Sequence, residues 1–319
     1  MICRNKEASW VLSISDVKVR ICGDATAARI VQMLKHLFPG FAFPDDAVSD
    51  SQLTVSCHCL SMSHEAFSPE PIDVTKTEHP MKVSLYRMAN QLHVHCPDHD
   101  PDMLVIGFLN GCLFYQQGSK SALCLLFRGT DEGDFVVGSL HKLLFVFICL
   151  AMAEKSRFLI HGAAIKKGPD GYIFWGSSGA GKTTVASFSA REQVLSDDAP
   201  LIMKSDDHYY CYGTPYCQLD RTDHHFESLH NPVSITRQFF LHQAEGLNIN
   251  DRAKSEALRE ILSRHVHGFR FMNRLLKGKA FHFFYEFCLR IPAQDLYFTK
   301  DDRFWGIIPP ADSQGDAAS

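Results

Sequence analysis

The sequence lacks the features that mark secreted, membrane-spanning and nucleic-acid-binding proteins. Its first residues are not followed by the apolar segment of a secretory signal. The longest apolar run, residues 143–153, is bounded by charged residues and is shorter than the roughly 20 residues that span a bilayer. A net charge of -4 gives no electrostatic reason to bind nucleic acid. We therefore expect neither a membrane span nor a nucleic-acid partner.

Paired cysteines are also lacking. The 11 cysteines are an odd number and contain no C-x-x-C pair, so they do not suggest a disulfide framework. Reduced thiols in a cytoplasmic protein are expected. Cys57-His58-Cys59 with His64, and residues 93–96 with His99, could suggest zinc. A strand would place His58 on the opposite face from the two cysteines, so we favour ordinary packing and surface histidines over a metal site.

Length and composition predict a folded α/β protein with two domains. The 319 residues are 45% hydrophobic and 21% charged, which is ordinary for a globular chain. Residues 1–138 contain short alternating segments and one helix, residues 25–38, which Asp24 can cap. They predict a smaller N-terminal α+β domain. Residues 139–308 form the expected second domain, and the small, polar residues 309–319 are expected to be disordered.

Patterns in the second half predict the order of its elements. An apolar helix over residues 137–155 comes before two strands, residues 157–165 and 171–175, that a turn joins into a hairpin. Further strands are expected at 193–198, 200–203, 208–212, 237–241, 295–299 and 304–308, with helices at 269–289 and from Asn250, as its cap, to about residue 267.

The most specific motif is the glycine-rich loop, residues 176–183, which has the spacing G-x-x-x-x-G-K-[ST]. Such a loop wraps a polyphosphate with backbone N–H groups, while its lysine reaches the terminal phosphates and its hydroxyl binds Mg²⁺. The motif therefore predicts ATP with Mg²⁺. The candidate nucleotide-binding residues are Gly176, Ser177, Ser178, Gly179, Ala180, Gly181, Lys182, Thr183 and Thr184.

Three further polar residues flank this loop. His161 lies on the strand expected beside the one that feeds the loop, and Asp197 and Asp198 end the strand that follows the loop helix. Carboxylates at a strand end beside a phosphate loop suit a Mg²⁺ ligand and a catalytic base.

The order of these elements resembles a known family. I-H-G-A-A-I at 160–165, the glycine-rich loop and L-S-D-D at 195–198 are similar to the catalytic domain of HPr kinase/phosphorylase. They are also similar to ATP-dependent phosphoenolpyruvate carboxykinase, which shares the nucleotide core. The resemblance is specific over residues 157–200, weaker to 308, and absent before 137. It implies an HPr kinase/PEP carboxykinase-like P-loop core.

The resemblance also implies roles for individual residues. Lys182 and Thr183 would hold the phosphates and Mg²⁺, and one of Asp197 and Asp198, with Asp197 as the favoured ligand, would complete the metal shell. The choice of base among Asp197, Asp198 and His161 stays open at this point. The glycine-rich signature of true HPr kinase/phosphorylases is not found, so the chain resembles the broader group of HPr-kinase-like proteins.

These observations predict an ATP-dependent kinase. It would transfer the γ-phosphoryl group to a hydroxyl, with a seryl group of a small molecule, peptide or protein as the favoured acceptor, and the N-terminal domain would hold this acceptor. The alternatives are a carboxykinase-type enzyme and a nucleotide-gated binding or regulatory protein with little catalysis. The chain is also a candidate for a homo-oligomer, with dimer and hexamer both open.

Overall fold

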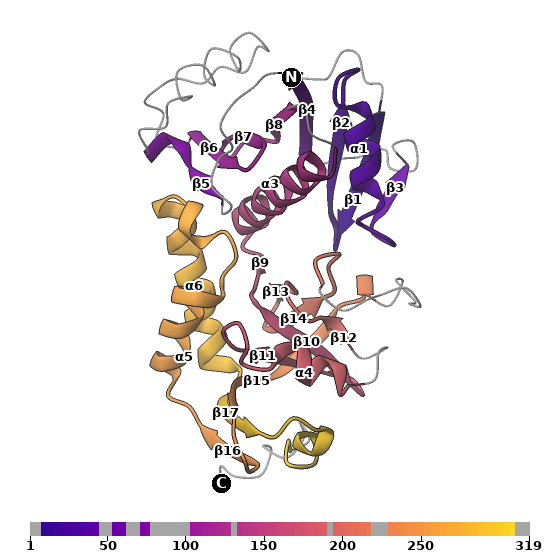
Figure 1. Ribbon diagram of the computed structural model, residues 1–319. Helices are drawn as coiled ribbons and strands as arrows, with labels where there is room; N and C mark the ends of the chain where they lie inside the picture. The colour runs from indigo at the N-terminus through magenta and orange to yellow at the C-terminus, as the bar shows by residue number, and fades with distance from the viewer. Residues whose placement is uncertain are drawn as a thin grey trace. The chain divides into compact units, whose positions relative to one another are not determined.

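The computed structural model describes residues 8–44, 53–61, 71–76, 103–128, 133–189, 194–217 and 229–309 (Figure 1). This part of the chain is mixed α/β and contains two mixed sheets. The chain divides into two compact units. The first comprises Met1–Glu154 with Arg270–Asn273, and the second comprises Lys155–Phe269 with Arg274–Ser319.

The first unit is built on an eight-stranded sheet with the order β3-β1-β2-β4-β8-β7-β6-β5. The hairpins β1–β2 and β6–β7 and the pair β7–β8 are antiparallel, whereas β2, β4 and β8 pair in parallel. The strands are β1 (Ala8–Ile14), β2 (Val17–Gly23), β3 (Ala42–Pro44), β4 (Leu53–Ser61), β5 (Ile72–Asp73), β6 (Met103–Phe108), β7 (Gly111–Gln116) and β8 (Ser121–Arg128); the helices are α1 (Ala28–Lys35), η2 (Val74–Lys76) and α3 (Gly133–Glu154).

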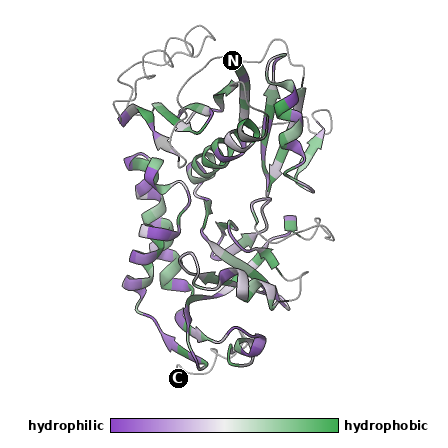
Figure 2. Cartoon of the chain, viewed as in Figure 1, coloured by the Kyte–Doolittle hydropathy of each residue, from purple (hydrophilic) through white to green (hydrophobic). Residues whose placement is uncertain are grey.

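Helix α3 is the apolar helix expected from the sequence, and it is mostly buried. It packs against β6, β7, β8 and α1, and Figure 2 shows hydrophobic colouring on it and on the strands of both sheets. Within the described residues, Val136–Glu154 is the only helical stretch long and apolar enough to cross a membrane, and 78% of its most apolar window is buried in the protein. Packing on the sheet therefore accounts for its composition. The same packing makes α3 part of the first unit, so the chain divides after Glu154, whereas the boundary expected at 138/139 falls inside the helix.

The second unit is built on a nine-stranded sheet. Its main path is β12-β10-β11-β15-β14-β13-β9; β17 also pairs with β15, and β16 pairs with β17. The strands are β9 (Phe158–Leu159), β10 (Gly162–Lys167), β11 (Asp170–Trp175), β12 (Val194–Ser196), β13 (Leu201–Ser205), β14 (His208–Tyr212), β15 (Val233–Gln243), β16 (Asn248–Asp251) and β17 (Ala293–Phe298).

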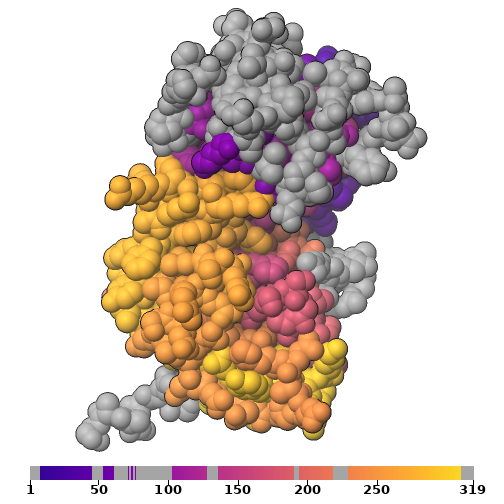
Figure 3. Space-filling view, turned by 60° about the vertical axis from the view of Figure 1, so that its left-hand side comes forward, coloured from indigo at the N-terminus to yellow at the C-terminus, as the bar shows by residue number. Residues whose placement is uncertain are grey.

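The helices of this unit are α4 (Lys182–Ser187), α5 (Lys254–Glu260), a π-helical turn η5 (Ile261–His265), η6 (Phe269–Phe271), α6 (Arg274–Arg290) and η7 (Asp302–Gly306); η6 straddles the two units. The space-filling view shows the outer side of α5 and α6 in orange and yellow tones (Figure 3).

The expected hairpin before the glycine-rich loop is confirmed, since β10 and β11 pair antiparallel over their whole length. Two local predictions are wrong. Asn250 caps no helix, because it lies in β16 opposite Asp295, and α5 begins at Lys254. Residues 304–308 form no strand, because Asp301 accepts a hydrogen bond from the Arg303 N–H at 3.0 Å and caps η7. Two of the short alternating segments of the N-terminal domain, residues 81–86 and 91–96, which also suggest strands, lie outside the described residues, as do residues 310–319 of the tail.

One buried side-chain amide in the sheet of the second unit uses both its oxygen and its nitrogen in hydrogen bonds. Gln238 on β15 is fully buried. Its Oε1 accepts a hydrogen bond from Trp175 Nε1 at 2.9 Å, and its Nε2 donates to the carbonyl of Ile291 at 3.0 Å. This amide therefore ties β11, which feeds the glycine-rich loop, to β15 and to the end of α6.

The substitution Gln238→Leu is expected to lower the free energy of unfolding of the second unit by about 2–5 kcal/mol, because the indole N–H and the Ile291 carbonyl lose their partner. Hydrogen exchange at the amides of β11 and β15 measures this loss. Gln294→Leu, at a half-buried position with a surface hydrogen bond to Asp251, is the matched control and should cost less than about 1 kcal/mol. Equal losses in the two variants would contradict the expectation.

Candidate functional site

The glycine-rich loop joins the end of β11 to the start of α4, as the sequence predicts. Gly179 and Gly181 have φ angles of 81° and 112°, in the left-handed region that disfavours other residues. A Cβ atom at Gly181 would lie 2.5 Å from the Phe298 ring, and one at Gly176 would lie 2.7 Å from the Ala180 Cβ. Ser177, Ser178 and Gly179 are exposed at the turn, so its backbone is open to solvent on one side and closely packed on the other.

A residue distant in sequence holds this loop. Gln243, the last residue of β15, donates from Nε2 to the carbonyl of Gly179 at 2.6 Å. It pairs in register with Phe298 of β17, so both strands deliver a side chain to the loop. Sequence reasoning missed Gln243, because only the pairing of β11, β15 and β17 brings it here.

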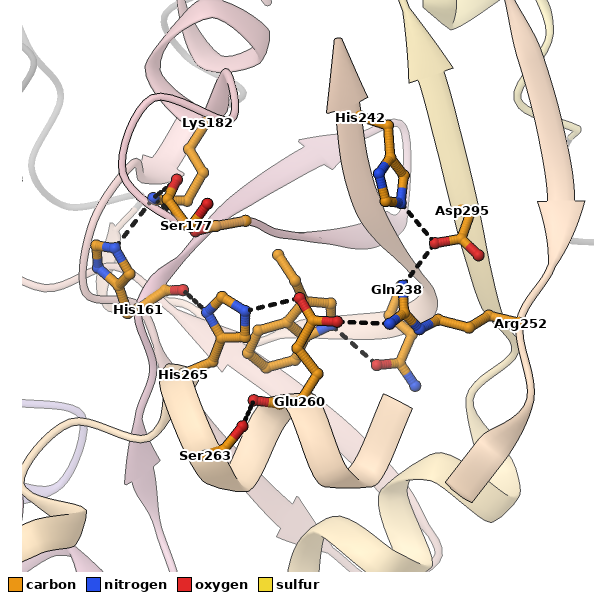
Figure 4. Close-up of polar contacts among 12 residues, drawn as sticks. His161, Ser177, Lys182, Gln238, His242, Arg252, Glu260, Ser263, His265 and Asp295 are labelled. Atoms are coloured by element: carbon orange, nitrogen blue, oxygen red, sulfur yellow. Dashed lines mark hydrogen bonds and ion pairs between the residues drawn. The ribbon is translucent and has the colours of Figure 1, made fainter. Parts of the chain in front are cut away.

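Lys182 makes three hydrogen bonds from its ammonium group. Nζ lies 2.8 Å from the Gly176 carbonyl, 3.3 Å from the Ser177 carbonyl and 3.0 Å from Nε2 of His161. Figure 4 shows the bonds to Ser177 and His161. An ammonium group only donates, so Nε2 of His161 accepts and its ring proton is on Nδ1. Burial lowers the pKa of Lys182, while the charges of Asp198 and Asp197 oppose this shift.

His161 and Asp198 form a pair. Nδ1 of His161 lies 3.1 Å from Oδ1 of Asp198, and each side chain is about a quarter exposed. Burial would raise the pKa of Asp198, but the hydrogen bond from His161 and the charges of His161, His267 and Lys182 outweigh it and lower this pKa. Asp198, His161 and Lys182 therefore form a continuous polar row that ends at the glycine-rich loop.

Asp197 occupies a different environment from its neighbour. Its side chain is 1% exposed, and its Oδ1 accepts a hydrogen bond from the Cys217 thiol at 2.7 Å. It acts on Lys182 through its charge, which raises that pKa. Thr183 is exposed on the first turn of α4. The direct contacts thus join His161, Lys182 and Asp198, whereas Asp197 lies behind them and Thr183 faces solvent.

The sequence predicted that His161 lies within a strand over residues 157–165, but in the structure it does not. β9 ends at Leu159 and β10 begins at Gly162, so His161 lies in the break between them. Residues 265–267, at the end of the π-helical turn η5 and just after it, pack against this break. The His161 N–H donates to the carbonyl of His265 at 2.8 Å, and the His267 N–H donates to the carbonyl of Leu159 at 3.0 Å. His267 Nε2 also lies 3.3 Å from the backbone oxygen of Asp198.

No group of three or more histidine, cysteine or acidic side chains in the described residues is arranged to hold a metal ion. Cys57 and Cys59 are buried, and His58 contacts Asp24 at 2.5 Å instead. His64, residues 93–96 and His99 lie outside the described residues. A Mg²⁺ ion held between Thr183 and a nucleotide does not need such a cluster, because Mg²⁺ keeps several waters and takes phosphate oxygens as ligands.

No protein-family model matches the chain, and no curated protein is significantly similar to it. Any functional assignment therefore depends on the residues of this site and on their geometry.

The stability of the second unit is expected to fall as the pH is lowered from about 6.5 to about 4. Burial lowers the pKa of His265 from 6.5 to about 4, so between these values the unfolded chain binds a proton that the folded chain does not. Stability is thus fully present above pH 6.5, and the loss is at most about 3 kcal/mol.

Hydrogen exchange of the β11 and β15 amides at pH 7 and 5, corrected for intrinsic rates, measures this change. His265→Asn should flatten the profile, whereas His282→Asn, at a side chain that is 74% exposed, should not. An unchanged slope in His265→Asn would exclude His265 as its source.

Proposed function

We propose that the protein is a Mg-ATP-dependent kinase that transfers the γ-phosphoryl group of ATP to a hydroxyl, a seryl group being the favoured acceptor. The observation that carries the proposal is the row Asp198–His161–Lys182, which ends on the glycine-rich loop. The hairpin-fed loop and the order of these residues also support an HPr-kinase-like P-loop core. Such a core needs little covalent chemistry from the protein, since positioning and charge neutralisation supply most of the catalysis.

The residues present suit a bound nucleotide. The exposed backbone of Ser177, Ser178 and Gly179 would offer N–H groups to the phosphates, and Lys182 would exchange its bonds to loop carbonyls for bonds to phosphate oxygens. Thr183 would bind Mg²⁺ from the first turn of α4, and the carboxylate of Asp197 would be the acidic ligand of the same ion. Bound Mg²⁺ would neutralise charge on the phosphates.

The geometry favours His161 with Asp198 over Asp197 as the base. Asp197 is buried against Cys217, whereas His161 and Asp198 are partly exposed. When the Lys182 ammonium group bonds phosphate oxygens, it no longer donates to Nε2 of His161. The Nε2 lone pair is then available to accept the proton of the acceptor hydroxyl. The acceptor oxygen then bonds to the γ-phosphorus, ADP leaves, and Asp198 stabilises the imidazolium through its bond to Nδ1.

The first unit is the proposed acceptor-binding unit, since the nucleotide and base residues all lie in the second.

Two alternative functions make different predictions. A carboxykinase would convert oxaloacetate to phosphoenolpyruvate. A nucleotide-gated binding protein would bind ATP but would not depend on Asp198 for turnover.

Purified protein with Mg-ATP and a panel of serine, seryl peptides and proteins should show phosphotransfer. Lys182→Ala and Asp198→Asn are each expected to lower kcat at least about 100-fold, because the first removes the positive charge on the phosphates and the second removes the carboxylate charge that stabilises the His161 imidazolium. Lys277→Ala, at an exposed position on α6, is the matched control and should keep full activity. If no acceptor gains phosphate above the Lys182→Ala background, the kinase proposal fails, and ATP binding without turnover would favour the nucleotide-gated protein.

The Mg²⁺ requirement tests the two metal residues. Thr183→Ala and Asp197→Asn are each expected to raise the Mg²⁺ concentration for half-maximal activity by about 10-fold, since the first would remove an oxygen ligand and the second would replace a charged oxygen ligand by a neutral amide oxygen. Titration of activity with Mg²⁺ at saturating ATP measures this shift. Asp207→Asn, at a side chain that is 79% exposed, is the control for the lost charge. An unchanged Mg²⁺ requirement in Asp197→Asn would remove Asp197 from the metal site.

A further inference from the structure

The backbone of His161 lies at a crossing of the sheet. β9 pairs with β13 at one edge, while β10 lies near the other edge between β11 and β12. Residues 160–162 carry the chain between them. The N–H groups of the two flanking residues donate to backbone carbonyls of residues 198–200. The Ile160 N–H donates to the Pro200 carbonyl at 3.1 Å, and the Gly162 N–H donates to the Asp198 carbonyl at 3.3 Å. The peptide groups of His161 itself need partners from elsewhere.

His265 supplies both of them. Its carbonyl accepts the His161 N–H at 2.8 Å, and its ring Nδ1 donates to the His161 carbonyl at 3.0 Å. One residue therefore holds the N–H and the C=O of His161 together. The two imidazole rings lie nearly parallel, with an interplanar angle of 16° and centroids 6.2 Å apart.

The side chain of His265 is itself fixed. It is fully buried, and its ring lies 5.5 Å from that of Trp175. On its far side Nε2, which carries no proton in the Nδ1–H tautomer, lies 3.6 Å from Oε1 of Glu260 and makes no hydrogen bond to it. Glu260 is held by Arg252, which also bonds Asp295 at 2.6 Å. Figure 4 shows this succession of polar contacts from Lys182 through His161 and His265 to Arg252 and Asp295. A carbonyl only accepts, so Nδ1 of His265 carries the proton.

We propose that His265 is a positioning residue for His161: its ring N–H fixes the His161 peptide so that the imidazole reaches Asp198 and Lys182 together. The inference deepens the proposed kinase mechanism and rests on it for its catalytic consequence. Without the Nδ1–H donor, the 161–162 peptide loses the bond to its carbonyl, while the 3.3 Å bond from the Gly162 N–H to the Asp198 carbonyl remains. The looser peptide lets the His161 ring move from the position that gives the 3.1 Å and 3.0 Å contacts. Misplacement of a catalytic group by about 1 Å can cost about 100-fold in rate.

Two substitutions separate positioning from simple packing. His265→Phe keeps an aromatic ring but removes the donor, and His265→Asn keeps an amide N–H close to the place of Nδ1. We expect His265→Phe to lower kcat by about 10- to 100-fold with KM for ATP changed less than about 2-fold, and His265→Asn to stay within about 3-fold of the parent. His282→Phe, on the exposed face of α6, is the matched control. If both His265 variants lose the same activity in proportion to lost folded protein, the residue serves packing only and the proposal is wrong.

A spectroscopic readout makes the test independent of turnover. Long-range proton–nitrogen spectra of the full chain with labelled histidine rings report the tautomer of His161, whose signals are assigned by their loss in His161→Asn. The parent and His265→Asn should show the Nδ1–H tautomer, and His265→Phe should show averaged signals while still binding ATP. If the parent transfers no phosphate but the tautomer responds in this way, the positioning inference stands and the kinase proposal fails. An unchanged tautomer in folded His265→Phe overturns the positioning inference.

Discussion

The peptide of His161 needs hydrogen-bond partners that neither flanking strand provides, and much of the site follows from how that need is met. An unsatisfied backbone group is costly away from water, so a chain that crosses between distant strands must recruit partners from other segments. Here the crossing is made by residues 160–162. Backbone carbonyls of residues 198–200 accept hydrogen bonds from Ile160 and Gly162, and the backbone of residues 265–267 bonds His161 and Leu159. The segment 198–200 carries Asp198, and the segment 265–267 carries His265 and His267. The backbone requirement thus brings ionisable side chains from three separate parts of the sequence to the end of the glycine-rich loop.

The loop depends on a second constraint, which is steric. Gly176 and Gly181 leave no room for a Cβ atom, because Ala180 and the Phe298 ring lie against them. Phe298 belongs to a buried cluster with Phe174, Phe239 and Phe304, so the tight turn is packed onto the core of the unit. Packing against that core, together with the hydrogen bond from Gln243 to the Gly179 carbonyl, holds the loop in one conformation in the structure. Preorganisation of this kind lowers the entropy that binding must overcome.

The sequence was sufficient where structure is determined locally. The glycine-rich loop, the hairpin before it and the buried helix α3 follow from spacing, turn residues and apolar periodicity, and they are found where they were expected. The sequence was insufficient where pairing between distant segments determines the position of a residue. Asn250 has the side chain of a helix cap but is drawn into a strand by β17, and Gln243 and His265 reach the site only through strand register and the π-helical turn. Local patterns contain no information on such partners.

The adjacent carboxylates show how the fold can separate two chemically equal residues. Sequence alone left Asp197, Asp198 and His161 as equivalent candidates for the base. In the structure Asp198 accepts a bond from His161 and is partly exposed, whereas Asp197 is buried against a thiol and acts on Lys182 through charge. Two carboxylates in different environments can take different roles. In the proposed mechanism Asp197 binds Mg²⁺, and Asp198 bonds the Nδ1–H of His161. The proposed division into a metal ligand and a base pair follows from this difference in burial and in partners, and the proposed role of His265 is to hold His161 between Asp198 and Lys182.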